Sequence, residues 1–167
     1  MLQPLPIPCN KFEYWTIDFI MGLPDINGFN ALLVCVEKFG TLCRLIPCRA
    51  GENELSAPAI AKLFFEHVVR LSGVPRVVLH DRDPRFTAAF WKELWKILGC
   101  KTVFSSSFHP QTDGQMERHN RTIEQVVRAH GHKHGLSWLE AIPLVEMSLN
   151  NAVNDSTCMS PTFISYG

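Results

Sequence analysis

Three acidic residues combine the side-chain type and the spacing that metal-assisted phosphoryl chemistry requires. Asp18 lies inside an apolar segment that predicts a strand, where an unpaired carboxylate is costly to bury. Asp81 ends a second predicted strand, and Glu117 lies in the first turn of a predicted helix. Carboxylates from two strands and a helix can converge on hard cations such as Mg²⁺ or Mn²⁺, which prefer oxygen ligands. Such ions activate a water or hydroxyl and stabilise the leaving oxygen of a phosphoryl group.

Each acid also has a structural interpretation. A strand aspartate such as Asp18 is often explained by a hydrogen-bond network or an edge position. Asp81 could cap the helix that follows, but Asp83 directly precedes a proline and suits that role better. Asp113 precedes a glycine and therefore favours a turn, which leaves Glu117 as the third candidate ligand. We therefore interpret Asp83 and Asp113 as structural, and the other three acids as functional.

The loop and helix around Glu117 carry further side chains that suit contacts with nucleic acid. These are His109, Gln111, Arg118, Arg121 and Arg128. Arginine side chains match phosphate oxygens, although a solvated helix face paired with Glu124 explains them equally well. His109 and Gln111 either position nucleic acid in the loop or only cap the loop. Residues 82–133 hold nine Lys or Arg against five Asp or Glu, which permits phosphate binding without requiring it. The alternating histidines at positions 130, 132 and 134 predict a solvated loop rather than a metal-binding tract.

The elements that must position these residues follow from hydrophobic periodicity. Strands are expected at residues 14–21, 31–37, 41–48, 76–81 and 101–105. Helices are expected at residues 54–71, 87–98, about 116–133 and 138–151. Three strands followed by alternating strands and helices predict an α/β fold, with a mixed five-stranded sheet and helices on both faces. Three prolines predict an extended arm over residues 1–10, and residues 11–167 are expected to form a single domain.

The composition suits one folded domain. Of the 167 residues, 46% are hydrophobic and 19% charged, which is enough apolar content for a core. Basic and acidic residues are equal in number, so net charge does not by itself indicate a nucleic-acid partner. The six cysteines form no C-x-x-C pair, and reduced core thiols in an intracellular protein are expected. No apolar run is long enough to span a bilayer, so no membrane partner is expected.

Longer segments resemble the catalytic core of retroviral-type integrases. Asp18 in WTIDFI, Asp81 in HDRDPRF and Glu117 in HPQTDGQMERHNRT are similar to the D,D-35-E triad of that family. Thirty-five residues separate the last two acids, as the family name requires. The resemblance is to integrases of Ty3/gypsy long-terminal-repeat retrotransposons in particular. It covers nearly the whole chain, through DFIMGLP, LFFEHVVRLSGVP, FWKELWKILG, PLVEMSLNNAVNDST and SPTFISYG.

This resemblance implies a ribonuclease H-like fold and a metal-dependent polynucleotidyl transferase that integrates DNA. In the family, a nucleotide end is first trimmed with water, and the exposed 3′-hydroxyl then attacks a target-strand phosphate. Asp18, Asp81 and Glu117 match the family's ligands for Mg²⁺ or Mn²⁺. The implied partners are DNA, with RNA as an alternative, and a second copy of the chain; the implied location is the nucleus. Apolar side chains on the helices predicted at 87–98 and 138–151 also favour a homodimer.

The chain departs from the family pattern at three positions. His80 stands where the family usually has Ser before the second aspartate, and Glu37 and Gly40 stand in place of Asp and Ser. The family's zinc-binding and C-terminal DNA-binding modules have no counterpart in this sequence, so we expect a core alone. Two alternatives to an active integrase core stay open. One is an inactive, transposon-derived module that binds nucleic acid or a partner, and the other is a ribonuclease H-type nuclease.

Overall fold

Three segments rich in apolar and β-branched residues form a meander of neighbouring strands. They are β1 (Tyr14–Ile20), β2 (Ala31–Glu37) and β3 (Cys43–Cys48), each antiparallel to the next. A fourth strand, β4 (Val77–His80), pairs with β1 in the parallel direction, which gives the order β3-β2-β1-β4. β1 therefore lies between an antiparallel and a parallel neighbour.

The structure is a computed structural model that describes residues 10–51, 55–80, 88–98, 123, 125, 137–155 and 157–167. The strand predicted at residues 101–105 lies outside this set, so the predicted five-stranded sheet is described as four strands. Most of the arm predicted at residues 1–10 and of the helix predicted to end near residue 133 also lies outside it. Two residues of that helix, Ile123 and Gln125, are described, and both are helical.

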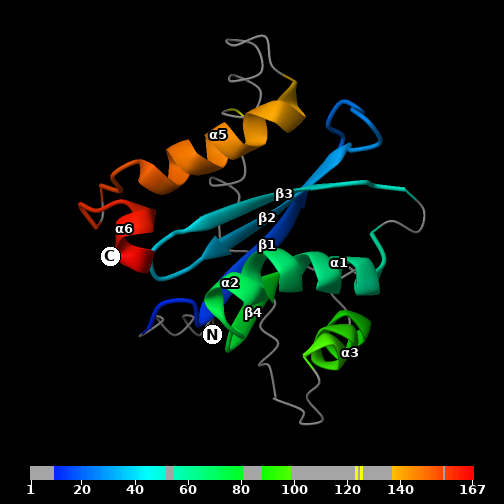
Figure 1. Cartoon of the computed structure of the whole chain (residues 1–167), viewed down its shortest axis with the longest axis horizontal. Helices are drawn as coiled ribbons and strands as arrows, with labels where there is room; N and C mark the ends of the chain where they lie inside the picture. Colours follow the sequence, from blue (N-terminus) through cyan, green and yellow to red (C-terminus); the bar gives the residue numbers. More distant parts are fainter. Residues whose placement is uncertain are drawn as a thin grey trace, which may run out of the picture.

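Helices cover the sheet on both faces (Figure 1). One face carries α1 (Ala57–Phe64), the π-helical turn η1 (Phe65–Val69), α2 (Arg70–Ser72) and α3 (Ala88–Ile97). The other face carries α5 (Trp138–Asn151), and α6 (Pro161–Tyr166) follows it at the C-terminus. The predicted α/β architecture, a mixed sheet between two helical layers, is confirmed.

Alternation along the strands separates two apolar clusters, one on each face of the sheet. Trp15 and Ile17 belong to the cluster that α1 and α3 cover. Ile20 and Val34 belong to the cluster that α5 covers. Because β1 contributes to both clusters, a residue's position along this strand decides which helical layer its side chain faces.

Two features of the helices were not predicted. The helix expected at residues 54–71 is present, but its centre is the π-helical turn η1, where the wider turn holds one extra residue. The short helix α6 is too brief to give a detectable apolar period. Its start did carry a signal, because Ser160 caps the Phe163 N–H and Pro161 occupies the first helical position.

None of the described cysteines forms a disulfide. Cys35, Cys43 and Cys48 are buried, as predicted. Burial raises the pKa of Cys35, and burial together with the Glu146 carboxylate raises the pKa of Cys43 to about 12, so both stay protonated and act as small apolar groups. Cys158 is exposed, so the prediction of core cysteines is wrong there. The other two cysteines lie outside the described residues.

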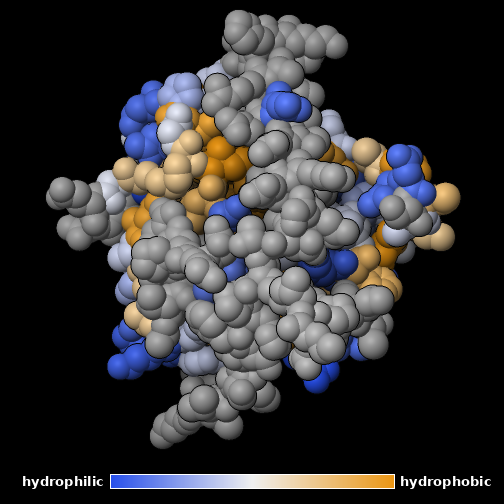
Figure 2. All heavy atoms as spheres, turned by 180° about the vertical axis from the view of Figure 1, so that it is seen from behind, coloured by the Kyte–Doolittle hydropathy of each residue, from blue (hydrophilic) through white to orange (hydrophobic). Residues whose placement is uncertain are grey.

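Exposed apolar side chains gather in the C-terminal part of the fold. Large ones on α5, α6 and the turn between them are Leu144, Met147, Val153, Met159, Phe163 and Tyr166. In Figure 2, which views the molecule from behind, hydrophobic side chains lie in separate groups toward the sides, with hydrophilic ones beside them. Within the described residues, no helix is long and apolar enough to cross a membrane.

Candidate functional site

Asp18 lies near the carboxyl end of β1. It pairs with Val34 of β2, so its side chain projects from the face that α5 covers. The residue is half-buried, and its Oδ1 accepts a hydrogen bond from the Phe19 backbone N–H at 2.7 Å. A carboxylate in this position is a hard oxygen donor of the kind that Mg²⁺ prefers, so Asp18 fits the predicted role.

The parallel pairing of β1 with β4 brings a second strand end beside Asp18. Ile17 pairs with His80, the last residue of β4. The residue after Ile17 is Asp18, and the residue after His80 in the sequence is Asp81, which lies outside the described residues. The carboxyl ends of neighbouring parallel strands meet at one edge of a sheet, and open α/β folds bind ligands at such edges.

Ile123 gives one fixed point in the helix that was predicted to carry the third acid. It is fully buried in the same cluster as Ile20 and Val34, on the face of the sheet from which Asp18 projects. Gln125, two residues later, is exposed. Ile123, six residues after Glu117 in the sequence, is therefore on the buried side of this helix.

The remaining predicted site residues lie outside the described part of the chain. They are Asp81, Glu117, His109, Gln111, Arg118, Arg121 and Arg128, together with Asp83 and Asp113, the two acids interpreted as structural. Among the residues that the structure describes, no three His, Cys, Asp or Glu side chains come together as metal ligands would. The ligand set therefore stays a prediction, and Asp18 is the member that the structure places.

Two of the three departures from the family pattern take part in a single contact. Glu37 is only 1% exposed, and its carboxylate accepts hydrogen bonds from the backbone N–H groups of Phe12, Phe39 and Gly40. A Cβ at Gly40 would lie 2.9 Å from Cγ2 of Ile164, closer than real Cβ contacts allow. The two departures therefore act together. Glu37 accepts hydrogen bonds from three amides, and Gly40 leaves the space that Ile164 occupies.

This contact lies away from the candidate site. Glu37 pairs with Trp15, three residues before Asp18 in β1, which corresponds to roughly 10 Å along the strand. The third departure, His80, lies at the end of β4 and is half-buried. His80 is therefore the departure that adjoins the site, while those at positions 37 and 40 act on packing.

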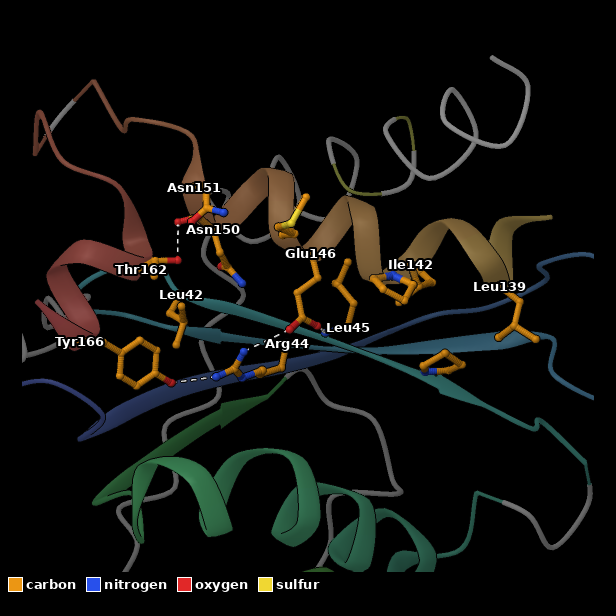
Figure 3. Close-up of a pocket in the computed structure, with 13 residues that line it drawn as sticks. Leu42, Arg44, Leu45, Leu139, Ile142, Glu146, Asn150, Asn151, Thr162 and Tyr166 are labelled. Carbon is orange, nitrogen blue, oxygen red and sulfur yellow. Dashed lines mark hydrogen bonds and ion pairs between the residues drawn. The ribbon is translucent and has the colours of Figure 1, made fainter. Parts of the chain in front are cut away.

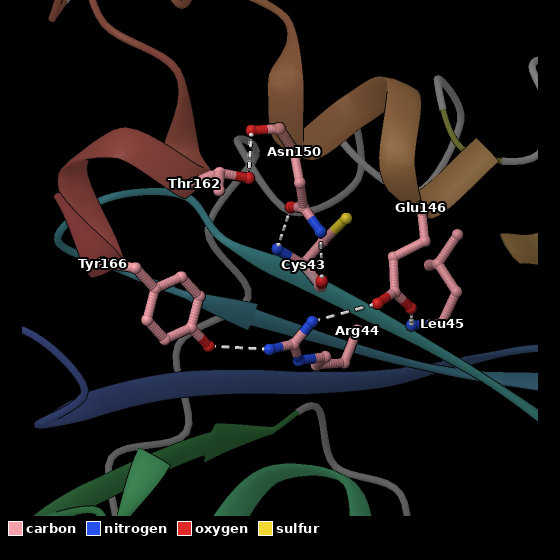
Figure 4. A network of polar contacts seen from close by, with 7 residues as sticks. All are labelled: Cys43, Arg44, Leu45, Glu146, Asn150, Thr162 and Tyr166. Atoms are coloured by element: carbon pink, nitrogen blue, oxygen red, sulfur yellow. Dashed lines mark hydrogen bonds and ion pairs between the residues drawn. The ribbon is translucent and has the colours of Figure 1, made fainter. Parts of the chain in front are cut away.

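A hollow of about 530 Å³ lies elsewhere, between β3, α5 and α6 (Figure 3). Its polar side chains are linked: Arg44 Nη1 lies 3.1 Å from Glu146 Oε1, and Arg44 Nη2 donates a hydrogen bond to the Tyr166 hydroxyl at 2.8 Å (Figure 4). The hollow adjoins β3, which is separated from β1 by β2, so it is distinct from the carboxylate site.

This linked group was missed at the level of sequence. One signal was available, because Glu146 and Asn150 are four residues apart in a predicted helix and so share a face. Their partners are in β3, about a hundred residues earlier in the chain, and helical spacing does not indicate such long-range contacts.

Comparison with known proteins connects these features to a family. No family model matches the chain. The Tf2-3 transposon polyprotein of Schizosaccharomyces pombe is 36% identical over 160 residues, which cover 96% of this chain and 12% of the polyprotein. The catalytic core domain of HTLV-2 integrase in complex with magnesium matches 93% of this chain and 97% of its own, with 18% identity and a TM-score of 0.67. The homologues of the chain are thus Tf2 transposon polyproteins, which are of the Ty3/gypsy type, and its fold is that of an integrase catalytic core.

The same fold is also found in a chain of a larger assembly. In the structure of the simian T-cell lymphotropic virus intasome in complex with the PP2A regulatory subunit B56 gamma, one chain matches 98% of this chain over 58% of its own length. The TM-score is 0.76 at 12% identity. The predicted resemblance and the ribonuclease H-like fold are confirmed. The chain spans 12% of the length of the Tf2-3 polyprotein that it matches.

Proposed function

We propose that the chain is the catalytic core of a DNA integrase, a metal-dependent polynucleotidyl transferase that processes 3′ ends and joins them to target DNA. The observation that carries this proposal is the pairing of Ile17 with His80. If that parallel register continues by one residue, Asp18 and Asp81 project from the same face at the same sheet edge. Homology to the Tf2 polyproteins supports the proposal, whereas RNA has no support as a partner.

Asp18, Asp81 and Glu117 are the proposed ligands of Mg²⁺ or Mn²⁺. The burial of Ile123 on the Asp18 face supports the approach of the third acid, and the HTLV-2 core was solved with magnesium. When bound, such cations supply activation of the attacking oxygen and stabilisation of the leaving oxygen. Contacts with DNA phosphates are proposed for His109, Gln111, Arg118, Arg121 and Arg128. Action on chromosomal DNA would require a nuclear location.

The direct test is an assay of the purified chain on branched DNA with Mg²⁺, with Mn²⁺ and with chelator. We expect strand cleavage or joining with either metal and none with chelator. A folded parent chain that is inert with both metals would favour the alternative of an inactive, transposon-derived module. His80, which stands where the family usually has Ser, is the departure that suggests this alternative. Cleavage of an RNA–DNA hybrid without activity on branched DNA would favour the nuclease.

Metal binding should also be visible without turnover. Three carboxylates that approach one another repel when no cation is bound, so a divalent ion should stabilise the folded state. At about ten times its dissociation constant, the ion should raise the melting temperature by roughly 3–6 °C. The double variant Asp18→Asn with Asp81→Asn should lose most of this gain. An unchanged melting curve of the parent with saturating Mn²⁺ would contradict the proposed ligands.

A homodimer is also proposed. The exposed side chains of the structure shift the expected interface from α3 to α5 and α6. α3 offers less apolar surface than predicted, because Phe90 and Leu94 are fully buried within the chain. Met147 of α5 and Phe163 of α6 are 56% and 58% exposed, so these helices offer the better surface. The HTLV-2 core has dimeric and trimeric forms, which supports self-association of this fold.

Charged substitutions on this surface should separate the protomers. Met147→Lys and Phe163→Lys are each expected to weaken self-association by roughly tenfold or more, because a buried lysine replaces an apolar anchor. Light scattering across a concentration series measures this. Leu71→Lys is the matched control, since Leu71 is 51% exposed on α2, in the other helical layer. A parent that is monomeric at high concentration would exclude the homodimer.

A further inference from the structure

β3 is the outer strand on one side of the described sheet, and its outward backbone groups can be identified. In an antiparallel pair, alternate residues of an edge strand direct N–H and C=O away from the partner. The even-numbered residues face β2, since the Leu42 carbonyl accepts from Glu37 N–H at 2.8 Å and the Cys48 carbonyl from Asn30 N–H at 3.2 Å. The outward residues are therefore at positions 43, 45 and 47.

Side chains of α5 take up these outward groups (Figure 4). The Asn150 carboxamide accepts from Cys43 N–H at 2.8 Å and donates to the Cys43 carbonyl at 2.9 Å, as a neighbouring strand would. Oε2 of Glu146 accepts from Leu45 N–H at 2.7 Å. Pro47 has no N–H. Every outward donor position of β3 is thus either occupied by α5 or absent.

The two side chains are held in place by contacts on their far side. Asn150 is only 5% exposed, and its backbone carbonyl accepts from the Thr162 hydroxyl of α6 at 2.9 Å. The other oxygen of Glu146 faces Arg44, whose guanidinium also donates to Tyr166 of α6. α6 therefore braces α5 against the strand edge, which fixes both side chains in the geometry that the edge requires.

We propose that Asn150 and Glu146 close the β3 edge against strand pairing with a second copy of this chain. An unpaired strand edge is a template for another strand. Every other copy of the chain carries the same edge, so a second copy is the partner that is always present. Apolar packing of α5 alone would cover the face of the sheet but would leave the edge amides available. The hydrogen bonds between Asn150 and Cys43 and between Glu146 and Leu45 therefore show that α5 covers the edge of β3 as well as the face of the sheet.

The unmodified chain provides the first test. Amide hydrogen exchange measured by NMR should show the Cys43 and Leu45 amides to be roughly tenfold or more slower than their intrinsic rates, because each is hydrogen-bonded. Exchange of both amides at the intrinsic rate would overturn the proposal. This test needs no substitution and therefore does not depend on the folding of a variant.

The second test opens the edge. Asn150→Leu removes both hydrogen bonds at similar size, and Asn151→Leu is the matched control at the next, exposed position. We expect only Asn150→Leu to speed hydrogen exchange of the Cys43 amide. We also expect only this variant to form assemblies of greater mass than the parent forms, as measured by light scattering and thioflavin binding. If Asn150→Leu does not fold, Glu146→Leu takes its place, with Glu146→Gln as a control that keeps an acceptor for Leu45. Faster exchange without added assembly in a folded variant would overturn the proposal.

Discussion

Asp18→Asn is expected to lower metal-dependent cleavage and joining of DNA by at least about a hundredfold while the fold remains intact. Asparagine keeps the size of the side chain and an oxygen that can still accept from the Phe19 N–H, so the local contact should survive. What is lost is the negative charge that holds a divalent cation. Product formation on branched DNA measures the effect, and the melting curve without metal verifies the fold.

Glu117→Gln should have an effect of similar size, and two neighbouring acids provide its controls. Glutamine keeps helix propensity but removes the charge that the proposed site needs. Asp113→Asn and Asp83→Asn should retain most of the parent's activity, because asparagine serves turns and helix caps nearly as well as aspartate. If Glu117→Gln keeps activity and Asp113→Asn loses it, the third ligand has been misassigned.

Glu37→Leu should be among the most damaging changes for stability. It leaves three backbone N–H groups, those of Phe12, Phe39 and Gly40, without the carboxylate that accepts from them. Each unsatisfied buried donor costs about 1–3 kcal/mol, and two of the three groups are only partly buried, so the loss should total roughly 3–5 kcal/mol. Urea unfolding measures this free energy.

The same substitution at a surface position gives the control for this prediction. Glu93→Leu removes an exposed i,i+3 pair with Lys96, at 3.4 Å, and such pairs contribute about 0–1 kcal/mol. Glu37→Gln should be intermediate, because one oxygen still accepts while the new NH₂ group faces an N–H. A Glu37→Leu protein as stable as Glu93→Leu would show that water replaces the carboxylate at no cost.

The predictable part of the fold was the part set by local pattern. Apolar runs gave β1 and β2 nearly residue for residue, and the helix predicted at residues 138–151 has the bounds of α5 despite Pro143 near its start. Asp18 was identifiable because burying a carboxylate inside such an apolar run is costly unless it has a partner. Sequence could not give the register of β1 on β4, since parallel pairing across a long connection leaves no local signature.

Features that depend on distant partners were the ones missed. Glu37 was identified only as a departure from the family's aspartate, and its role as an acceptor for three amides appears only when Phe12 is folded beside it. Asn150 was not identified from the sequence, although its carboxamide pairs with β3. In both cases the side chain forms hydrogen bonds with backbone groups whose position is set by tertiary structure.

The position of β1 between two kinds of neighbour has a consequence for the order of folding. β1, β2 and β3 are consecutive in the chain and can pair early, whereas β4 reaches β1 only after residues 49–76 have crossed over. Asp18 is thus available in the first-formed meander, but its proposed partner after His80 arrives with the last of these strands. We therefore expect a nascent or partly folded chain to lack catalytic activity, because the proposed pairing of Asp18 with Asp81 requires β4 to have joined β1.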